Sequence, residues 1–204
     1  MTDQILRVVE MFVSSALFYP ILTVVTAADC VLPLIPSETV LNIGGAWYGL
    51  YGKPNFWGLV GTAIVAAMIG DQLCYLVGRR FHGVVDRFPE DSKRGRIVVW
   101  ARKNVDRHAA SSIIIARFLP WGRWVLTLML GSVRFPWPRF FVFDTIGVIV
   151  WALQAALVGY IGGWAFRDYP LLGIVVGIVA GSAVGLIVQR FQQKYDAKHE
   201  HQDA

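Results

Sequence analysis

The chain has 204 residues, of which 55% are hydrophobic and only 16% charged, and its mean hydropathy is +0.51. Because a soluble domain carries about 25% charged residues, this composition excludes an ordinary soluble domain and predicts a polytopic membrane protein with one domain. The net charge of +5 does not indicate a nucleic-acid partner, since the basic residues gather at the ends of apolar segments, as in membrane proteins.

The N-terminal segment, residues 1–28, contains the first apolar run. Its first ten residues are polar and mixed in charge, and no small-residue site closes a short apolar core, so we expect no cleavable signal peptide. Residues 11–28 are predicted to span the membrane, with a kink at Pro20 that neighbouring helices can tolerate.

Residues 29–50 follow and are interrupted by prolines, including Pro36, before a cluster of glycines. Breaks and ionised groups within apolar sequence predict a helical hairpin that enters the membrane and returns to the same side. Residues 56–78 are predicted to form a second span, which contains the single charge of Asp71.

Residues 79–108 carry nine Lys or Arg side chains, with apolar residues at helical spacing between them. This pattern is typical of an amphipathic helix on the cytoplasmic membrane surface. Residues 109–133 are predicted to form a second hairpin, broken at Pro120. Two more spans are expected at residues 140–166 and 171–188, followed by a polar tail at 189–204. The fold class is therefore an all-α membrane protein with about four transmembrane helices and two re-entrant hairpins.

The basic residues predict the orientation of these segments. With the 79–108 loop in the cytoplasm, both termini are cytoplasmic. Outside the second hairpin, fifteen of the nineteen Lys and Arg residues then face the cytoplasm. The hairpins enter from opposite faces. The spacing from Pro36 to Tyr75 and Gly78 resembles that from Pro120 to Tyr160 and Gly163, which indicates an inverted repeat of the kind found in transporters.

Arg117 and Arg123 flank Pro120 in the second hairpin. Because a proline and a glycine break the helix between them, both guanidiniums can point toward one place. A guanidinium binds phosphate through a planar fork, so this pair suits an anionic lipid headgroup. The alternative is that both arginines extend to the cytoplasmic surface.

The first hairpin carries two carboxylates, Asp29 and Glu38. Glu38 either faces a polar cavity as a proton-binding group, or serves in the first turn of a half-helix that Ser37 caps. Asp29, at the start of the hairpin, either shares the proton-binding role or caps a helix. On the external side, either carboxylate could take up protons from a gradient.

Three further polar residues stand in the predicted spans. Asp71 and Tyr75 are four residues apart and share a helix face, so Asp71 can pair with an arginine of the second hairpin. Asp144 begins the third predicted span, a position that suits the membrane interface. Cys30 and Cys74 lack C-x-x-C spacing and the histidines form no metal motif, so we expect buried thiols, no metal and no cofactor.

Four motifs occur in order along the chain: D-x-x-x-P-x-I-P-S-E at 29–38, G-D-x-x-x-Y-x-x-G-R at 70–79, R-F-x-P-x-x-R at 117–123, and G-x-x-x-W-x(7)-G-Y-x-x-G at 147–163. Together they resemble the DedA family, also called SNARE-associated or VTT-domain membrane proteins. The resemblance covers residues 29–163 and implies two opposed re-entrant hairpins.

The same resemblance implies a function. Bacterial members are linked to moving lipid carriers, notably undecaprenyl phosphate, across the inner membrane with the proton-motive force, and eukaryotic relatives scramble phospholipids. It implies essential acids at Asp29 and Glu38 and essential arginines at Arg117 and Arg123. Two positions depart from the family pattern: the first acid is usually Glu, and the position of Asp144 more often holds Asn.

We therefore expect a lipid transporter of the bacterial inner membrane rather than an enzyme, with an anionic lipid, protons and the membrane as its partners. Whether the protein forms a homo-oligomer stays open. One alternative is a proton-coupled carrier of small cations or drugs. An enzyme acting on lipid phosphate is a weaker alternative, because the chain has no nucleophile with a nearby base.

Overall fold

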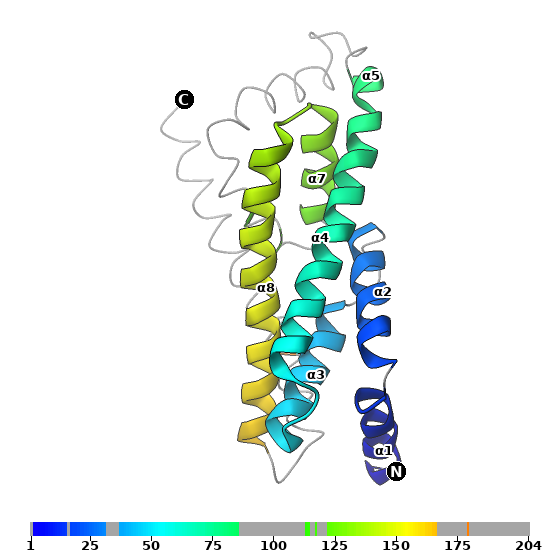
Figure 1. The fold of residues 1–204 in the computed structure, drawn as a ribbon, viewed down its shortest axis with the longest axis vertical. Coiled ribbons are helices and arrows are strands. Elements are labelled where there is room, and N and C mark those ends of the chain that lie inside the picture. The colour runs from blue at the N-terminus through cyan, green and yellow to red at the C-terminus, as the bar shows by residue number, and fades with distance from the viewer. Residues whose placement is uncertain are drawn as a thin grey trace.

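The structure, a computed structural model, describes residues 2–15, 17–31, 37–85, 113–114, 117, 122–166 and 179. The elements defined in these ranges are helices, and none of the described residues lies in a β-strand, which confirms the expected all-helical class. The helices are α1 (Thr2–Val13), α2 (Phe18–Val31), α3 (Ser37–Tyr51), α4 (Phe56–Arg80), α5 (His82–Val85), α7 (Gly122–Ser132) and α8 (Trp137–Ala165), as Figure 1 shows.

Two helices of the described ranges, α4 and α8, are long and apolar enough to cross a membrane, and a third span is possible if α1 and α2 count as one bent helix. Their 25 and 29 residues correspond to about 37 and 43 Å, more than the roughly 30 Å of a bilayer core. They coincide with the spans predicted at 56–78 and 140–166. The span predicted at 171–188, the basic loop and the polar tail lie outside the described ranges, apart from residue 179 and the first residues of the loop.

The kink predicted at Pro20 in the span at residues 11–28 lies instead before Phe18. The helix ends at Val13 and restarts at Phe18, and the two segments differ in direction by 87°. The hydroxyl of Ser15 accepts a hydrogen bond from the Leu17 N–H at 3.1 Å, so it satisfies a backbone group at the break. Pro20 lies in the first turn of α2, where its missing N–H removes no helical hydrogen bond, so it causes no kink.

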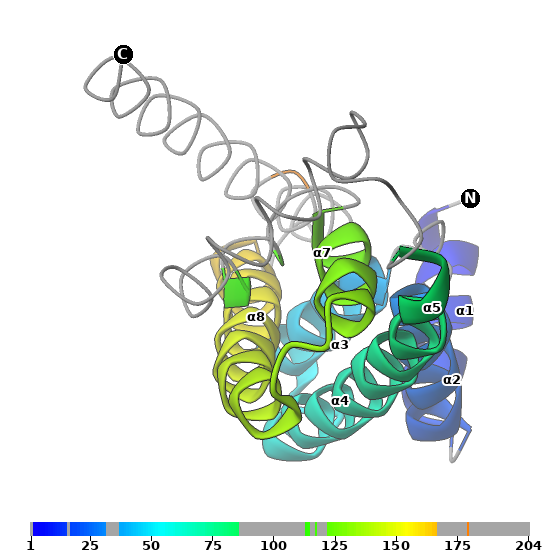
Figure 2. The same cartoon turned by 90° about the horizontal axis from the view of Figure 1, so that it is seen from above.

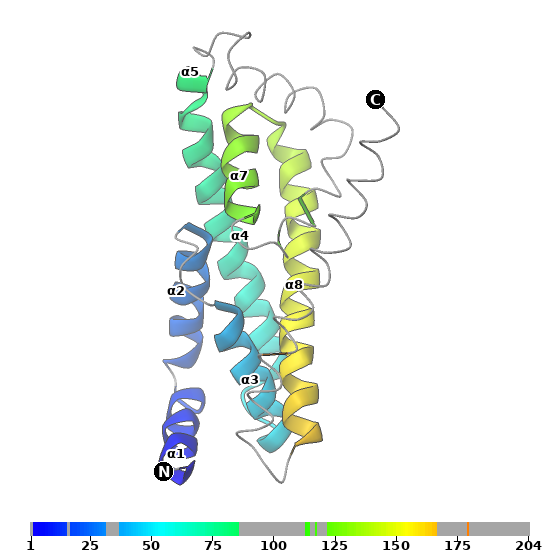
Figure 3. The ribbon, with the colours of Figure 1, turned by 180° about the vertical axis from the view of Figure 1, so that it is seen from behind.

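The half-length helices α3 and α7 lie one above the other between α4 and α8 (Figures 1 and 2). Seen from behind, α2 ends, α3 begins and α7 begins near the middle of the long helices (Figure 3). The chain thus runs to mid-height in α2 and returns in α3. Pro36 and Pro120, the predicted breaks of the two hairpins, lie outside the described residues.

Glycines allow the close approach of the half-length helices to the long ones. A Cβ atom at Gly49 of α3 would collide with the carbonyl oxygen of Tyr160 in α8. In the other half, a Cβ at Gly131 of α7 would collide with the carbonyl oxygen of Tyr75 in α4. Small residues at such crossings let two membrane helices pack backbone against backbone.

The same correspondence continues one turn further along. A Cβ at Gly163 would come within 2.8 Å of the Ala46 Cα, and one at Gly78 within 2.9 Å of the Leu128 Cα. Both glycines belong to the Tyr-x-x-Gly pattern that the sequence repeats. Equivalent residues therefore make equivalent backbone contacts in the two halves.

The apolar core is divided into two clusters. The larger one joins α2, α3, α4 and α8, and on α4 it ends at Ala67. The smaller one resumes at Tyr75 and includes Phe140 of α8. Between them, both long helices carry an aspartate: Asp71 on α4, and Asp144 between Phe140 and Val148 on α8. The fold therefore places a polar layer between two apolar layers.

Candidate functional site

Five charged residues meet in the polar layer between the two apolar clusters, and we call them the charged layer: Asp29, Asp71, Arg117, Arg123 and Asp144. The two aspartates on the long helices lie at similar depth. Asp71 is nine residues before the end of α4 and Asp144 seven residues after the start of α8, which at 1.5 Å per residue places both about 10–14 Å from the same end of the molecule.

Arg117 connects the two long helices. Its Nη2 atom donates to Asp71 Oδ2 and, at 3.1 Å, to Asp144 Oδ1. The side chains of these three residues are 4%, 1% and 4% exposed, respectively. The alternative that Arg117 extends to the cytoplasmic surface is therefore wrong, because its guanidinium is buried between two carboxylates.

Arg123 lies in the first turn of α7 and connects α7 to α2 and α4. Its Nη1 donates to Asp71 Oδ1 at 3.0 Å, and its Nη2 donates to the Asp29 carbonyl oxygen at 3.0 Å and to Asp29 Oδ2 at 3.4 Å. The side chain is 16% exposed. It too does not reach the surface.

Asp71 is the shared counter-ion of the two arginines, because each of its carboxylate oxygens accepts from a different guanidinium. Removing one partner of a buried ion pair costs roughly 3–5 kcal/mol, since it leaves an uncompensated charge. The position of Asp71 in the middle of α4, opposite both arginines, makes it the link on which the layer depends.

Asp144 does not face outward, as its place near the start of a predicted span suggested. It is buried against Arg117, because α8 begins seven residues earlier, at Trp137, and α4 covers this face. Its Oδ2 atom has no hydrogen-bond partner among the described residues. One oxygen of Asp144 is thus buried and unpaired, while the other accepts from the Arg117 guanidinium.

The two acids of the first hairpin differ in their surroundings. Asp29 belongs to α2 and accepts a hydrogen bond from the Ser37 hydroxyl at 2.6 Å, which connects the end of α2 to the start of α3. Glu38 is half-buried in the first turn of α3, and the part of the chain that the structure describes shows neither a hydrogen bond nor an ion pair to it. Asp29 therefore binds Arg123 directly. Glu38 shows no such contact within the described residues, and its nearest connection to the charged layer is its neighbour Ser37, which binds Asp29.

Tyr75 shares a helix with Asp71 but does not join the charged layer. Its hydroxyl donates to the Phe135 carbonyl oxygen at 2.5 Å, and its ring stacks on Phe140 with centroids 4.7 Å apart. Phe135 follows Arg134, whose positive φ of 58° closes α7. Tyr75 thus anchors the turn between α7 and α8.

Cys30 is a member of the site that the sequence did not indicate. Its Sγ atom accepts from Arg123 Nη1 and donates to the Ala67 carbonyl oxygen at 3.6 Å. The only signal was its place next to Asp29. A Cβ at Gly70 would come within 3.0 Å of this sulfur, so the absence of a side chain at Gly70 allows α2 to approach α4 closely enough for the contact.

The charged layer contains three carboxylates and two guanidiniums. Four of these residues belong to helices α2, α4, α7 and α8, and the fifth is Arg117. Within the described ranges, no group of His, Cys, Asp and Glu is arranged to hold a metal ion. Two half-length helices, α3 and α7, direct their N-termini toward this layer, and the positive end of a helix dipole favours a negative ligand. The arrangement can exchange a carboxylate for another anion.

Comparison with known proteins finds similar sequences over about two thirds of the chain. The family model of the VTT domain matches residues 35–161. The inner membrane protein YohD of Escherichia coli is 34% identical over 140 residues, 67% of this chain and 70% of YohD. The Protein DedA of the same organism is 27% identical over 135 residues, 65% of this chain and 62% of DedA.

A third relative, an uncharacterized membrane protein of Mycobacterium leprae, is 31% identical over 134 residues, 64% of this chain. The match spans 59% of that relative's length. No solved structure matches the chain. YohD and the Mycobacterium leprae relative are named as membrane proteins, and the two long apolar helices agree with a multi-pass membrane protein.

Proposed function

The chain belongs to the VTT domain family, to which DedA belongs, and we propose that it transports an anionic lipid across a bacterial inner membrane. The observation that carries this proposal is the pair of buried guanidiniums of Arg117 and Arg123, both held by Asp71 in the middle of apolar helices. Ionised groups within membrane helices are costly and usually serve transport. Undecaprenyl phosphate is the substrate that the family resemblance favours, and other phospholipids are the alternative.

The charged layer is closed on itself. Each guanidinium is bound by carboxylates, so a lipid phosphate must displace at least one of them to reach Arg117 and Arg123. Asp71 is the carboxylate that contacts both arginines, so its release would open a position on each, while Arg117 keeps Asp144 and Arg123 keeps Asp29. The arginine fork fits a phosphate as well as it fits a carboxylate, so the exchange replaces like contacts with like.

The charge balance of the layer couples phosphate binding to proton uptake. Three carboxylates already exceed two guanidiniums by one negative charge, and a phosphate would add more. In a low-dielectric layer such an excess is unfavourable, so proton uptake by a carboxylate accompanies phosphate binding. Asp29 and Glu38 are the predicted proton carriers.

The fold suggests how the lipid moves. The repeated glycine contacts support an inverted repeat in which α2–α3 and the segment ending in α7 are re-entrant hairpins from opposite membrane faces. The headgroup would reach the charged layer from either face while its chains stay in the bilayer. For net transport, the two facing states must bind the lipid with different affinities.

A liposome assay with purified protein tests the proposal. We expect flipping of labelled undecaprenyl phosphate to be lost in Arg117→Gln and Arg123→Gln, which remove the phosphate ligands. Arg80→Gln, an exposed arginine at the end of α4, is the matched control and should keep the rate. Ordinary phospholipids, with and without a pH gradient, show the specificity and the coupling. Unchanged flipping in both Arg117→Gln and Arg123→Gln would contradict the proposal.

The second candidate is a proton-coupled carrier of small cations. The surplus carboxylate of the charged layer and the unpaired Asp144 Oδ2 favour it, because both could receive a cation. In the same liposomes, flux of a labelled organic cation driven by a pH gradient, without any labelled lipid, would support this alternative.

A further inference from the structure

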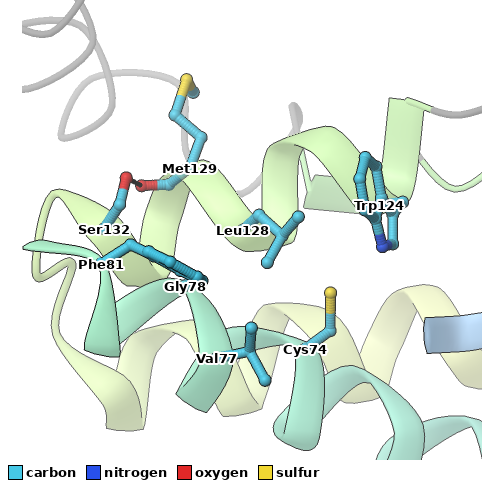
Figure 4. A pocket seen from close by; sticks show the side chains of 8 residues that line it. All are labelled: Cys74, Val77, Gly78, Phe81, Trp124, Leu128, Met129 and Ser132. Atoms are coloured by element: carbon cyan, nitrogen blue, oxygen red, sulfur yellow. Dashed lines mark hydrogen bonds between the residues drawn. The ribbon is translucent and has the colours of Figure 1, made fainter. Parts of the chain in front are cut away.

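A groove between α4 and α7 adjoins the charged layer. Its cavity has a volume of about 520 Å³, within the range of about 300–1,000 Å³ that small-molecule sites occupy. Figure 4 shows its lining, which comes from both helices: Cys74, Val77, Gly78, Phe81, Trp124, Leu128, Met129 and Ser132.

One end of the groove lies next to the arginines. Cys74 follows Asp71 by three residues, nearly one helical turn, and Trp124 directly follows Arg123. The lining then runs along α4 to Phe81, seven residues beyond Cys74, which corresponds to about 10 Å. The groove thus leads away from the phosphate ligands over a distance that a short segment of hydrocarbon chain would fill.

The chemistry of the lining favours hydrocarbon. None of the lining residues is charged, and the hydroxyl of Ser132 already donates to the Met129 carbonyl oxygen at 2.8 Å. Apart from the indole N–H of Trp124 and the thiol of Cys74, both at the end nearest the arginines, the lining offers a polar headgroup no free hydrogen-bond donor. On α4, Val77 and Phe81 are about half exposed, so the groove is open toward the surroundings of the helices.

We propose that this groove holds the chain segment that adjoins the lipid phosphate while Arg117 and Arg123 hold the phosphate itself. The inference rests on the proposed function and adds a second contact region to it. A lipid bound in this way is selected by its charge at the arginines and by the shape of its first chain carbons at the groove. Because a bilayer is as apolar as the groove, selection comes from packing rather than from the hydrophobic effect.

Substitution of Leu128 tests the proposal on protein in nanodiscs. Leu128→Trp fills the groove, and Val125→Trp, an exposed position on the same helix, is the matched control. We expect about tenfold weaker binding of a long-chain isoprenyl monophosphate to the Leu128 variant, with unchanged binding of a short-chain monophosphate and of inorganic phosphate. Val125→Trp should bind all three like the unaltered protein. Equal long-chain binding by both variants would overturn the inference.

A photo-crosslinking experiment on the unaltered protein serves if Leu128→Trp does not fold. The probe is an isoprenyl monophosphate with a diazirine in its first units, and adducts are located by mass spectrometry. We expect adducts on lining residues such as Leu128 and Met129. Adducts only outside the lining would overturn the inference, because they would show that the first carbons of the lipid chain do not occupy the groove.

The same assays separate this inference from the proposed function. If Arg123→Gln binds every monophosphate as well as the unaltered protein, the arginines are not the phosphate site and the proposed function fails. If Arg123→Gln loses the lipid but Leu128→Trp does not, the function stands and only the groove is wrong.

Discussion

Asp71 illustrates how a single residue decides the state of the site. Its two carboxylate oxygens hold two guanidiniums that the sequence places six residues apart, so neither arginine is free for another anion. Asp144 holds only Arg117, and only by one oxygen. The two aspartates therefore differ in what their removal would cost, although both are buried.

We predict that Asp71→Asn destabilises the protein by about 3 kcal/mol or more, because it removes the one carboxylate that contacts both buried guanidiniums and leaves each with a single carboxylate partner. Lipid transport should be lost together with its dependence on a pH gradient. Asp144→Asn should cost less than about 1 kcal/mol, since Arg117 keeps Asp71 and the amide oxygen can still accept a hydrogen bond. Thermal unfolding in detergent measures both; equal losses would refute the shared role of Asp71.

At the scale of helices, the contacts of the half-length helices determine where the charged layer forms. Gly163 brings α8 against α3 at Ala46, and Gly78 brings α4 against α7 at Leu128. Since Arg123 is in the first turn of α7, a shift of α7 along α4 would move its guanidinium away from Asp71. Glycine packing and ion pairing are thus coupled.

We expect Gly78→Ala and Gly163→Ala each to destabilise the protein by about 1–3 kcal/mol, because the added methyl group collides with backbone atoms that cannot move aside. Gly61→Ala is the control: it lies in the same helix as Gly78, and a Cβ there meets nothing within 4 Å. This control should be neutral or slightly stabilising through helix propensity. Similar melting temperatures for all three variants would contradict the backbone contacts.

At the scale of the whole molecule, the two ends of the helical bundle differ in the segments and basic residues that lie there. The α3–α4 connection, with Lys53, lies at one end, and Arg80 and α5 lie at the other (Figure 1). Basic residues favour the cytoplasmic side, which predicts that the α5 end is cytoplasmic and the Lys53 end external. An inverted repeat requires the two half-length helices to start from the middle and run to opposite sides.

Labelling with a membrane-impermeant maleimide on whole cells tests this orientation. We predict that Lys53→Cys reacts in intact cells, whereas Arg80→Cys reacts only after the membrane is permeabilised. The unaltered protein is the control, because Cys30 and Cys74 are buried and should stay unlabelled. The reverse pattern would invert the assignment of both hairpins without changing their contacts.

The sequence by itself determined the all-helical class and the two long spans, and it singled out the charged residues of the layer, although it also grouped Glu38 with them and placed Asp144 at the interface. Apolar length predicts α4 and α8, because a span must exceed the bilayer core, and charge within apolar sequence stands out whatever the fold. The repeat of Tyr75–Gly78 and Tyr160–Gly163 was visible too, and the glycine contacts give it a structural meaning.

Only the tertiary structure decided how these residues pair. Helical periodicity places Asp71 and Tyr75 on one face, yet Asp71 binds two arginines while Tyr75 anchors a turn, since their partners come from segments 46 or more residues away. The break before Phe18, the burial of Asp144 and the contact of Cys30 with Arg123 depend on which helix packs against which. Local sequence specifies a helix and its charges, whereas ion pairs between helices depend on the packing of the whole bundle.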